Sequence, residues 1–201
     1  MAAAWIKMID DGDAQGALKA LYDQVRTPHG TVDNVMRAHS LRPHTMAGHL
    51  ALYKSVLHHP DTTLPLWFLK TVAAYGSMTN DCAYSLLHHF TNARRLLKNK
   101  ARADAIDAAL RADAPERAFD GKELALLRYA RKLTAAVGAM EKADFDALKR
   151  AGCDDGEILE VNQVVAYFNC SNRLLNGLGV TTDGDVIGYY REEDDPSACA
   201  G

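Results

Sequence analysis

The fold is decided by the stretch LPLWFLKTVAAYGSMTNDCAYSLLHHFTNARR, which covers residues 64–95. Its first part, Leu66 to Met78, is strongly apolar and predicts a buried helix. A polar break follows, in which Asn80 or Asp81 can cap a second helix. That helix has a core stripe at steps of four, three and four residues, formed by Leu86, Phe90, Ala93 and Leu97. Two consecutive helices joined by a short polar turn are therefore expected.

The rest of the chain repeats this helical pattern. Apolar residues recur at helical spacing over almost the whole sequence, and period-two alternation is rare. Pro43 suits the first turn of a helix, and Asp154 or Asp155 can cap the last one. Further helices are expected over residues 14–26, 43–57, 103–111, 123–134, 142–151 and 157–175. We predict an all-α fold.

Composition and charge exclude several classes of protein. The chain has 201 residues, a net charge of −3, 48% apolar residues and 24% charged residues, as in an ordinary globular domain. The near-neutral charge argues against nucleic acid as a partner. No stretch approaches the roughly 20 apolar residues that cross a bilayer, and residues 1–9 do not resemble a signal peptide. We therefore expect a cytoplasmic protein with no membrane partner.

The chain is expected to form one domain over residues 1–183, within which residues 112–121 are the most linker-like stretch. Residues 184–201 are expected to form a flexible tail, because they include the chain end and the acidic run Glu192-Glu193-Asp194-Asp195. This charge run is interpreted as a solvated end of the chain.

Cysteine and histidine spacing predicts neither a disulfide framework nor a metal site. The four cysteines lie far apart and include no Cys-x-x-Cys pair, so thiols are expected. All eight histidines lie between His29 and His89, but no two have the three- or four-residue helical separation that converges on one metal. We interpret the histidines as surface or capping residues and predict no metal and no cofactor.

A more specific pattern is the segment Asn80-Asp81-Cys82-Ala83-Tyr84-Ser85, followed by His88-His89. It resembles the motif of the alkylhydroperoxidase D-like and carboxymuconolactone decarboxylase family. Leu41-Arg42-Pro43 resembles the entry helix of that family, and Tyr167-Phe168-Asn169 and Gly177-Leu178-Gly179-Val180 resemble the ending of its peroxidase-related branch. The resemblance covers residues 39–190 and implies a multihelical, homo-oligomeric alkylhydroperoxidase D-like bundle.

The resemblance also implies candidate catalytic residues. Active antioxidant members use a Cys-x-x-Cys pair, a His four residues after the second Cys and a Glu twelve residues before the first. The pair reduces hydroperoxides, and a thiol reductant restores it. In this sequence Cys82 matches the first Cys and His89 the His, whereas Ser85 replaces the second Cys and Lys70 the Glu. A Cys82–Ser85 disulfide cannot form, so two-thiol turnover within the motif is excluded.

Helix geometry places Ser85 closer to His89 than Cys82 is. Ser85 and His89 are one turn apart on one face, whereas Cys82 and His89 are about 10.5 Å apart along the helix axis. His89 therefore reaches Ser85 directly and Cys82 only through an intermediary. A helix N-terminus lowers a thiol pKa, and the neighbouring Asp81 raises it. Cys82 is accordingly either a peroxide-reactive thiol or a small residue that only packs.

Other candidates lie outside this pair. Cys170 is the candidate resolving thiol for Cys82. Tyr84, Lys70 and Arg173 are candidate substrate-binding residues, with Lys70 or Arg173 suited to an anionic group. Lys70 could instead reach solvent, and Arg173 could be a buried, paired residue of a packing helix.

Three functions are compatible with these residues. The leading hypothesis is weak thiol-dependent reduction of a small hydroperoxide, with Cys82 as the reacting thiol, His89 as proton relay and Ser85 as hydrogen-bond donor. The second is acid/base chemistry on a small carboxylate, as in the carboxymuconolactone decarboxylase branch, with His89 as general acid or base. The third is a binding or assembly protein on a catalytically decayed scaffold.

Overall fold

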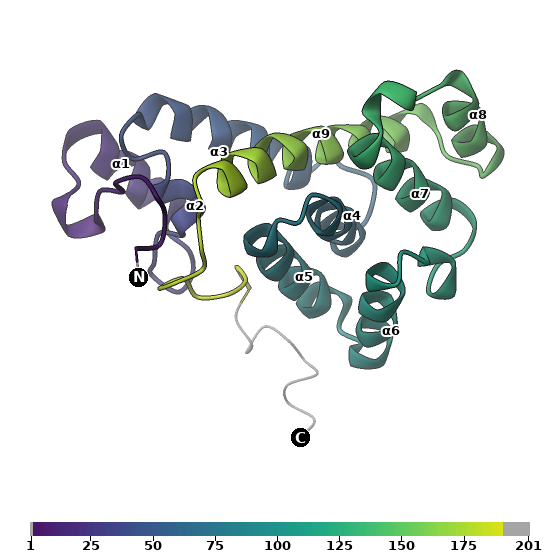
Figure 1. The fold of residues 1–201 in the computed structure, drawn as a ribbon, viewed down its shortest axis with the longest axis horizontal. Helices are drawn as coiled ribbons and strands as arrows, with labels where there is room; N and C mark the ends of the chain where they lie inside the picture. The colour runs from purple at the N-terminus through teal and green to yellow at the C-terminus, as the bar shows by residue number, and fades with distance from the viewer. Residues whose placement is uncertain (1, 191–201) are drawn as a thin grey trace.

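In the computed structural model, residues 2–190 are described, and within them the chain is helical with no strand. The all-α class predicted from the sequence is confirmed. Figure 1 shows α9 crossing the molecule, with α1–α3 toward one end and α6–α8 toward the other. Within residues 2–190, no helix combines the length and apolar character needed to cross a bilayer. The α-helices are α1 (Gly16–Val25), α2 (Asn34–Arg37), α3 (Pro43–Leu57), α4 (Leu66–Thr79), α5 (Ala83–Leu97), α6 (Lys100–Arg111), α7 (Gly121–Ala135), α8 (Lys142–Arg150) and α9 (Asp155–Gly177).

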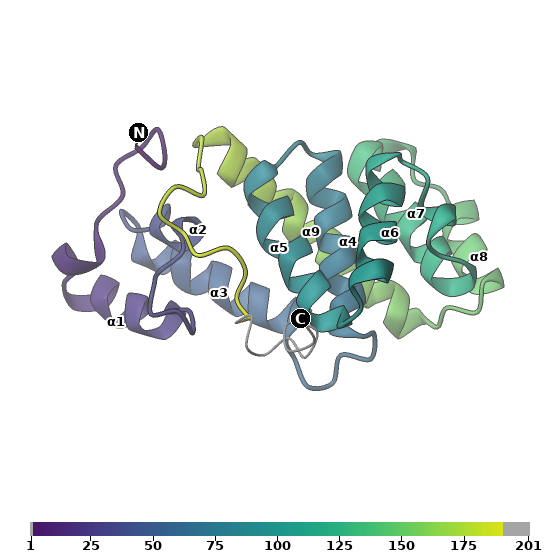
Figure 2. The same cartoon turned by 90° about the horizontal axis from the view of Figure 1, so that it is seen from below.

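Helix α4 forms the centre of the bundle. All its residues from Phe68 to Ser77 are buried, as expected of a helix that is apolar on every side. It packs against α5, α7 and α9, and Figure 2 shows α4 and α5 side by side along α9. Side chains of these helices, among them Leu69, Leu126 and Phe168, form the main apolar core.

The turn between α4 and α5 differs from the prediction. Neither Asn80 nor Asp81 caps α5; Cys82 precedes the helix, and no side chain makes the capping bond. Asp81 has a φ of +52°, a left-handed conformation that Asp tolerates better than most residues. The Cys82 N–H donates to the Ser77 carbonyl at 2.9 Å, which closes a tight turn. This turn determines where the Cys82 side chain lies.

Residues 112–121, the expected linker, are instead part of the packed body. They include a 3₁₀ helix, Pro115–Arg117, which contacts α6 and α7. Phe119 is 5% exposed and joins the main core. Apolar burial therefore fixes this stretch to its neighbours.

The chain after α9 returns across the bundle and lies against α2 and α5. The carboxylate of Asp185 accepts hydrogen bonds from the Asn34 N–H at 3.0 Å and from the Tyr84 hydroxyl. The Tyr189 N–H donates to the Asn92 side-chain oxygen at 2.8 Å. Residues 184–190, expected to begin a flexible tail, are thus held by hydrogen bonds. The acidic run that suggested such a tail falls at residues 192–195, outside the described residues.

Candidate functional site

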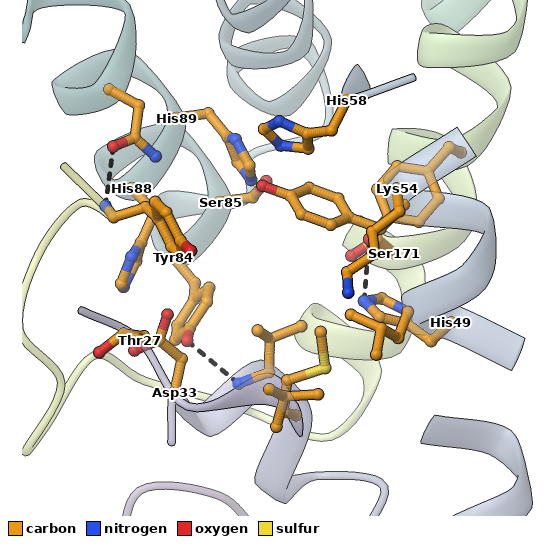
Figure 3. Close-up of a pocket in the computed structure, with 18 of the residues that line it drawn as sticks. Thr27, Asp33, His49, Lys54, His58, Tyr84, Ser85, His88, His89 and Ser171 are labelled. Atoms are coloured by element: carbon orange, nitrogen blue, oxygen red, sulfur yellow. Dashed lines mark hydrogen bonds between the residues drawn. The ribbon is translucent and has the colours of Figure 1, made fainter. Parts of the chain in front are cut away.

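A cavity of about 470 Å³ lies where α3, α5 and α9 meet the loop before α2 and the C-terminal segment (Figure 3). This volume suits a small organic ligand. Tyrosine rings and aliphatic side chains form much of its wall. The polar and titratable lining residues include Thr27, Asp33, His49, Tyr53, His58, Tyr84, Ser85, His88 and His89.

Helix α5 supplies one wall through side chains spaced one turn apart. The rings of Tyr84 and His88 stack with centroids 4.7 Å apart. Ser85 and His89 form the second pair and also line the cavity. The Ser77 hydroxyl of α4 lies 3.0 Å from the Ser85 hydroxyl and can donate to it. Ser85 is therefore a positioned hydroxyl next to an imidazole.

Lys70 lies behind this wall and does not reach solvent. It is 1% exposed, and its Nζ donates to the Tyr53 hydroxyl at 2.8 Å and lies 3.3 Å from Nε2 of His58. Among the described residues, no carboxylate lies within ion-pair distance of it. Burial without an anionic partner lowers the pKa of Lys70 to about 7. A large fraction of this amine is thus uncharged near neutral pH.

Three cavity histidines are also held in the uncharged form. Burial, followed by the nearby Lys70, lowers the pKa of His89 well below its usual range. The same two causes lower the pKa of His58. Burial lowers the pKa of His49 to about 4, and its Nε2 lies 2.8 Å from the Tyr167 hydroxyl. Neutral imidazoles can accept protons, although the lowered pKa also makes each of them a weaker base.

The opposite side of the cavity is acidic. Figure 3 places Thr27, Asp33 and His88 on one side and His49 on the other. Burial raises the pKa of Asp33 to about 6; His88 opposes this shift, and the neighbouring Asp185 adds to it. The His88 Nε2 lies 3.6 Å from an Asp185 carboxylate oxygen. The cavity therefore has a side lined by uncharged histidines and a side lined by the carboxyl group of Asp33, with Asp185 close to His88.

No protein-family model matches the sequence, and no curated protein matches it significantly. Solved structures do match. The chain aligns over 92% of its length with 95% of an alkylhydroperoxidase AhpD core, an uncharacterized peroxidase-related protein from Ralstonia eutropha JMP134, at 21% identity and a TM-score of 0.79. An uncharacterized peroxidase-related protein from Silicibacter sp. TM1040 matches with the same coverage and identity and a TM-score of 0.73. This chain has the AhpD fold.

A third structure with the AhpD fold is the debrominase Bmp8, a cysteine-to-alanine variant in complex with 2,3,4-tribromopyrrole. It covers 88% of this chain and 90% of its own, at 18% identity and a TM-score of 0.69. The alkylhydroperoxidase D-like bundle implied by the sequence resemblance is thus confirmed as a fold. At identities of 18–21%, these structures show the fold of this chain but not its activity.

Within this AhpD fold, Cys82 lies outside the cavity lining. It is 1% exposed and belongs to an apolar cluster with Ala4, Ala38, Leu175 and Val180. Burial raises the pKa of its thiol, although the Ser85 N–H opposes this shift. The expected lowering of the thiol pKa by the helix N-terminus is thus outweighed. Ser85, and not Cys82, presents its side chain to the cavity.

Cys170 and Arg173 lie on the exposed face of α9. The Arg173 guanidinium donates to the backbone and side-chain oxygens of Asn169, both at 2.8 Å. On this helix, Tyr167 and Ser171 face the cavity. Arg173 is exposed and is not among the residues that line this cavity, so the structure does not bring it together with Ser85 and His89. Cys170 is exposed whereas Cys82 is buried, so the two thiols lie in different environments.

Sequence reasoning did not select several cavity residues. Asp33, Tyr53 and His58 come from elements far from the family motif. The sequence feature that could have identified them is the concentration of all eight histidines before residue 90, but these histidines were interpreted as surface or capping residues. His49, His58, His88 and His89 line the cavity. Among the described residues, no group of three or more His, Cys, Asp or Glu is arranged to hold a metal ion.

Proposed function

We propose that the cavity binds a small cyclic organic molecule and catalyses proton transfer on it without a thiol. The observation that carries the proposal is that a serine hydroxyl, and not a cysteine thiol, lines the cavity wall. Ser85 lines the cavity beside His89, whereas Cys82 is enclosed by apolar side chains. A buried hydroxyl beside a neutral imidazole supports acid/base chemistry rather than redox chemistry.

His89 is the proposed proton acceptor. Its uncharged imidazole lines the cavity and can take a proton from an acidic carbon or hydroxyl of the ligand; because burial lowers its pKa and so weakens it as a base, the step depends on donors that stabilise the ligand anion. The imidazolium then returns that proton to a different atom of the ligand. The net reaction is an isomerisation, which needs no oxidant or reductant.

Ser85 and Tyr53 are the proposed donors to the ligand anion formed in this step. The Tyr53 hydroxyl accepts a hydrogen bond from Lys70, which leaves its own proton for an oxygen of the ligand. The Ser85 hydroxyl can likewise accept from Ser77 and donate its proton. Donors fixed before the reaction stabilise developing negative charge most strongly. Lys70 acts in this scheme as a positioning residue.

The cavity wall supports a cyclic ligand. The tyrosine rings at positions 84, 167, 189 and 190 line it and offer flat apolar surfaces. The debrominase with the same fold forms a complex with 2,3,4-tribromopyrrole, a small ring compound. Size and wall chemistry thus agree with a ligand of one or two rings.

Thiol-dependent peroxide reduction through Cys82 has less support. The thiolate is the reactive form, and burial raises the pKa of this thiol. The reacting sulfur would also lack direct access from the cavity. A binding protein on a decayed scaffold is the remaining rival, and it predicts a ligand without turnover.

The test combines a ligand screen with proton exchange. Carboxylated lactones and hydroxylated ring compounds are screened by thermal shift, and each ligand found is followed in D2O by proton NMR for loss of its C–H signals. We expect exchange in the wild type, a loss of about 100-fold or more in His89→Gln, and a change below about twofold in the control Cys82→Ala.

Three outcomes would contradict the proposal. Exchange that survives His89→Gln would remove the assigned base. Binding without exchange in the wild type would indicate a binding protein. Hydroperoxide consumption with a thiol reductant, abolished by Cys82→Ala, would restore the thiol mechanism.

A further inference from the structure

Two polar atoms at the acidic side of the cavity are buried without a hydrogen-bond partner among the described residues. They are Oδ1 of Asp33 and Nε2 of His88. Both residues line the cavity, and the His88 side chain is only 8% exposed. Buried polar groups in proteins are nearly always paired, so unpaired atoms on two cavity-lining residues mark a place where a ligand group or a water can complete them.

Within residues 2–190, the Asp33 carboxylate makes no hydrogen bond that holds the fold. Asp33 is the residue before α2, where an Asp side chain commonly caps the helix, but it makes no capping bond here. Its backbone carbonyl instead accepts from the Met36 N–H at 2.9 Å. The second carboxylate nearby, Asp185, is already occupied by the Asn34 N–H and the Tyr84 hydroxyl. Asp33 is thus an acceptor left for the cavity.

His88 presents the complementary group. The Gly188 N–H donates to its Nδ1 at 3.4 Å, and with Nδ1 as the acceptor the ring N–H is on Nε2. Stacking on Tyr84 fixes the orientation of the ring. The nearest carboxylate oxygen, on Asp185, is 3.6 Å from Nε2, beyond hydrogen-bond distance. His88 therefore offers a donor beside the acceptor of Asp33.

The geometry points to a subsite, formed by Asp33 and His88, for a ligand group that carries an N–H donor next to a hydrogen-bond acceptor, such as a primary carboxamide or a lactam. The N–H would donate to Asp33, and the carbonyl oxygen would accept from Nε2 of His88. This inference rests on the proposed function, because it names a chemical group of the ligand of the same cavity. It places that group opposite His89 and His58, so the reacting part of the ring would face the bases.

The test uses four ring compounds that differ in one group. Benzamide has the donor and the acceptor, N,N-dimethylbenzamide only the acceptor, benzylamine only a cationic donor, and benzoate only anionic acceptors. Dissociation constants are measured by ligand-observed NMR on the full chain. We expect benzamide to bind about tenfold or more tightly than the other three, because hydrogen bonds to charged groups are among the stronger ones.

Asp33→Ala tests the assignment to this residue. Since the carboxylate makes no hydrogen bond to the part of the chain that the structure describes, the variant should fold, and the preference for benzamide over its dimethyl analogue should fall below about threefold. Asp183→Ala, which removes an exposed carboxylate outside the cavity lining, should keep the preference.

Failure of this inference is distinguishable from failure of the proposed function. Equal binding of benzamide and its dimethyl analogue to the wild type would overturn the subsite but leave a cavity that binds rings. Tightest binding of benzylamine would also overturn it, in favour of a cation site. If none of the four binds, the subsite is overturned, and the lactone and hydroxylated-ring screen then decides separately whether the cavity binds cyclic molecules.

Discussion

Replacing Lys70 by methionine is expected to raise the free energy of unfolding at pH 6, with the gain lost by pH 9. Lys70 is 1% exposed, and its amine contacts Tyr53 and His58 rather than a carboxylate. Burial lowers its pKa from 10.5 to about 7. Between these values the unfolded chain binds more protons than the folded protein. Wild-type stability should therefore rise with pH across this window.

The magnitude follows from the same pKa values. The difference between 10.5 and about 7 corresponds to a cost of about 5 kcal/mol for the folded state at pH 6, since each pKa unit is worth about 1.4 kcal/mol. The cost falls to about 2 kcal/mol at pH 9, because the folded lysine is then uncharged and only the 1.5 pKa units between pH 9 and 10.5 still oppose removal of its proton. Methionine fills a similar volume but removes the hydrogen bond to Tyr53, at about 1–3 kcal/mol. The net gain is about 3 kcal/mol at pH 6 and near zero at pH 9.

Urea denaturation at the two pH values measures this difference. The control is Lys19→Met, which removes a lysine whose side chain is 57% exposed and should change stability by less than about 0.5 kcal/mol at either pH. A Lys70→Met protein that is less stable than wild type by the same amount at pH 6 and pH 9 would refute the reasoning. That result would mean that the amine keeps an ordinary pKa in the folded protein.

Three further predictions address other parts of the molecule. Iodoacetamide should alkylate exposed Cys170 at least about tenfold faster than buried Cys82, as measured by peptide mass spectrometry after timed quenching; equal rates would contradict the burial. Asp154→Ala should cost about 1 kcal/mol in urea denaturation, because its carboxylate caps α9, and an unchanged midpoint would count against the cap. Gly179→Ala should lower the melting temperature, because φ is +59° and the new Cβ would approach the Trp5 ring to 2.2 Å; a variant as stable as wild type would speak against this turn.

The regular helices could be predicted because their signals are local. The predicted span 43–57 coincides with α3, and the apolar stretch from Leu66 became the buried central helix. The four-residue α2 and the course of residues 184–190 could not be predicted in this way. Both depend on bonds between distant parts of the chain, such as that of the Asn34 N–H with Asp185, 151 residues away. The composition of residues 184–190 suggested flexibility, because composition alone does not show which distant residues a segment will bond.

Of the candidate site, only the residues on one face of α5 could be predicted from the sequence. The spacing of Ser85 and His89 requires no tertiary information, and both line the cavity. The environment of Cys82 depends on the turn at Asp81 and on apolar side chains from both ends of the chain, such as Ala4 and Val180. Its burial could therefore not be predicted from the motif. The remaining cavity residues come together only through packing of α3, α5 and α9.

Lys70 also bears on whether the cavity is functional. A buried amine without an anionic partner costs the folded state several kcal/mol, by the values above. A scaffold that served only for packing or assembly would be more stable with an apolar residue at this position. Under the proposed function, the lysine instead positions the Tyr53 hydroxyl, to which it donates a hydrogen bond. This chain has Lys70 and Ser85 at the positions where active antioxidant members of the family have Glu and Cys. These differences therefore fit a change from thiol to acid/base chemistry better than a simple loss of activity.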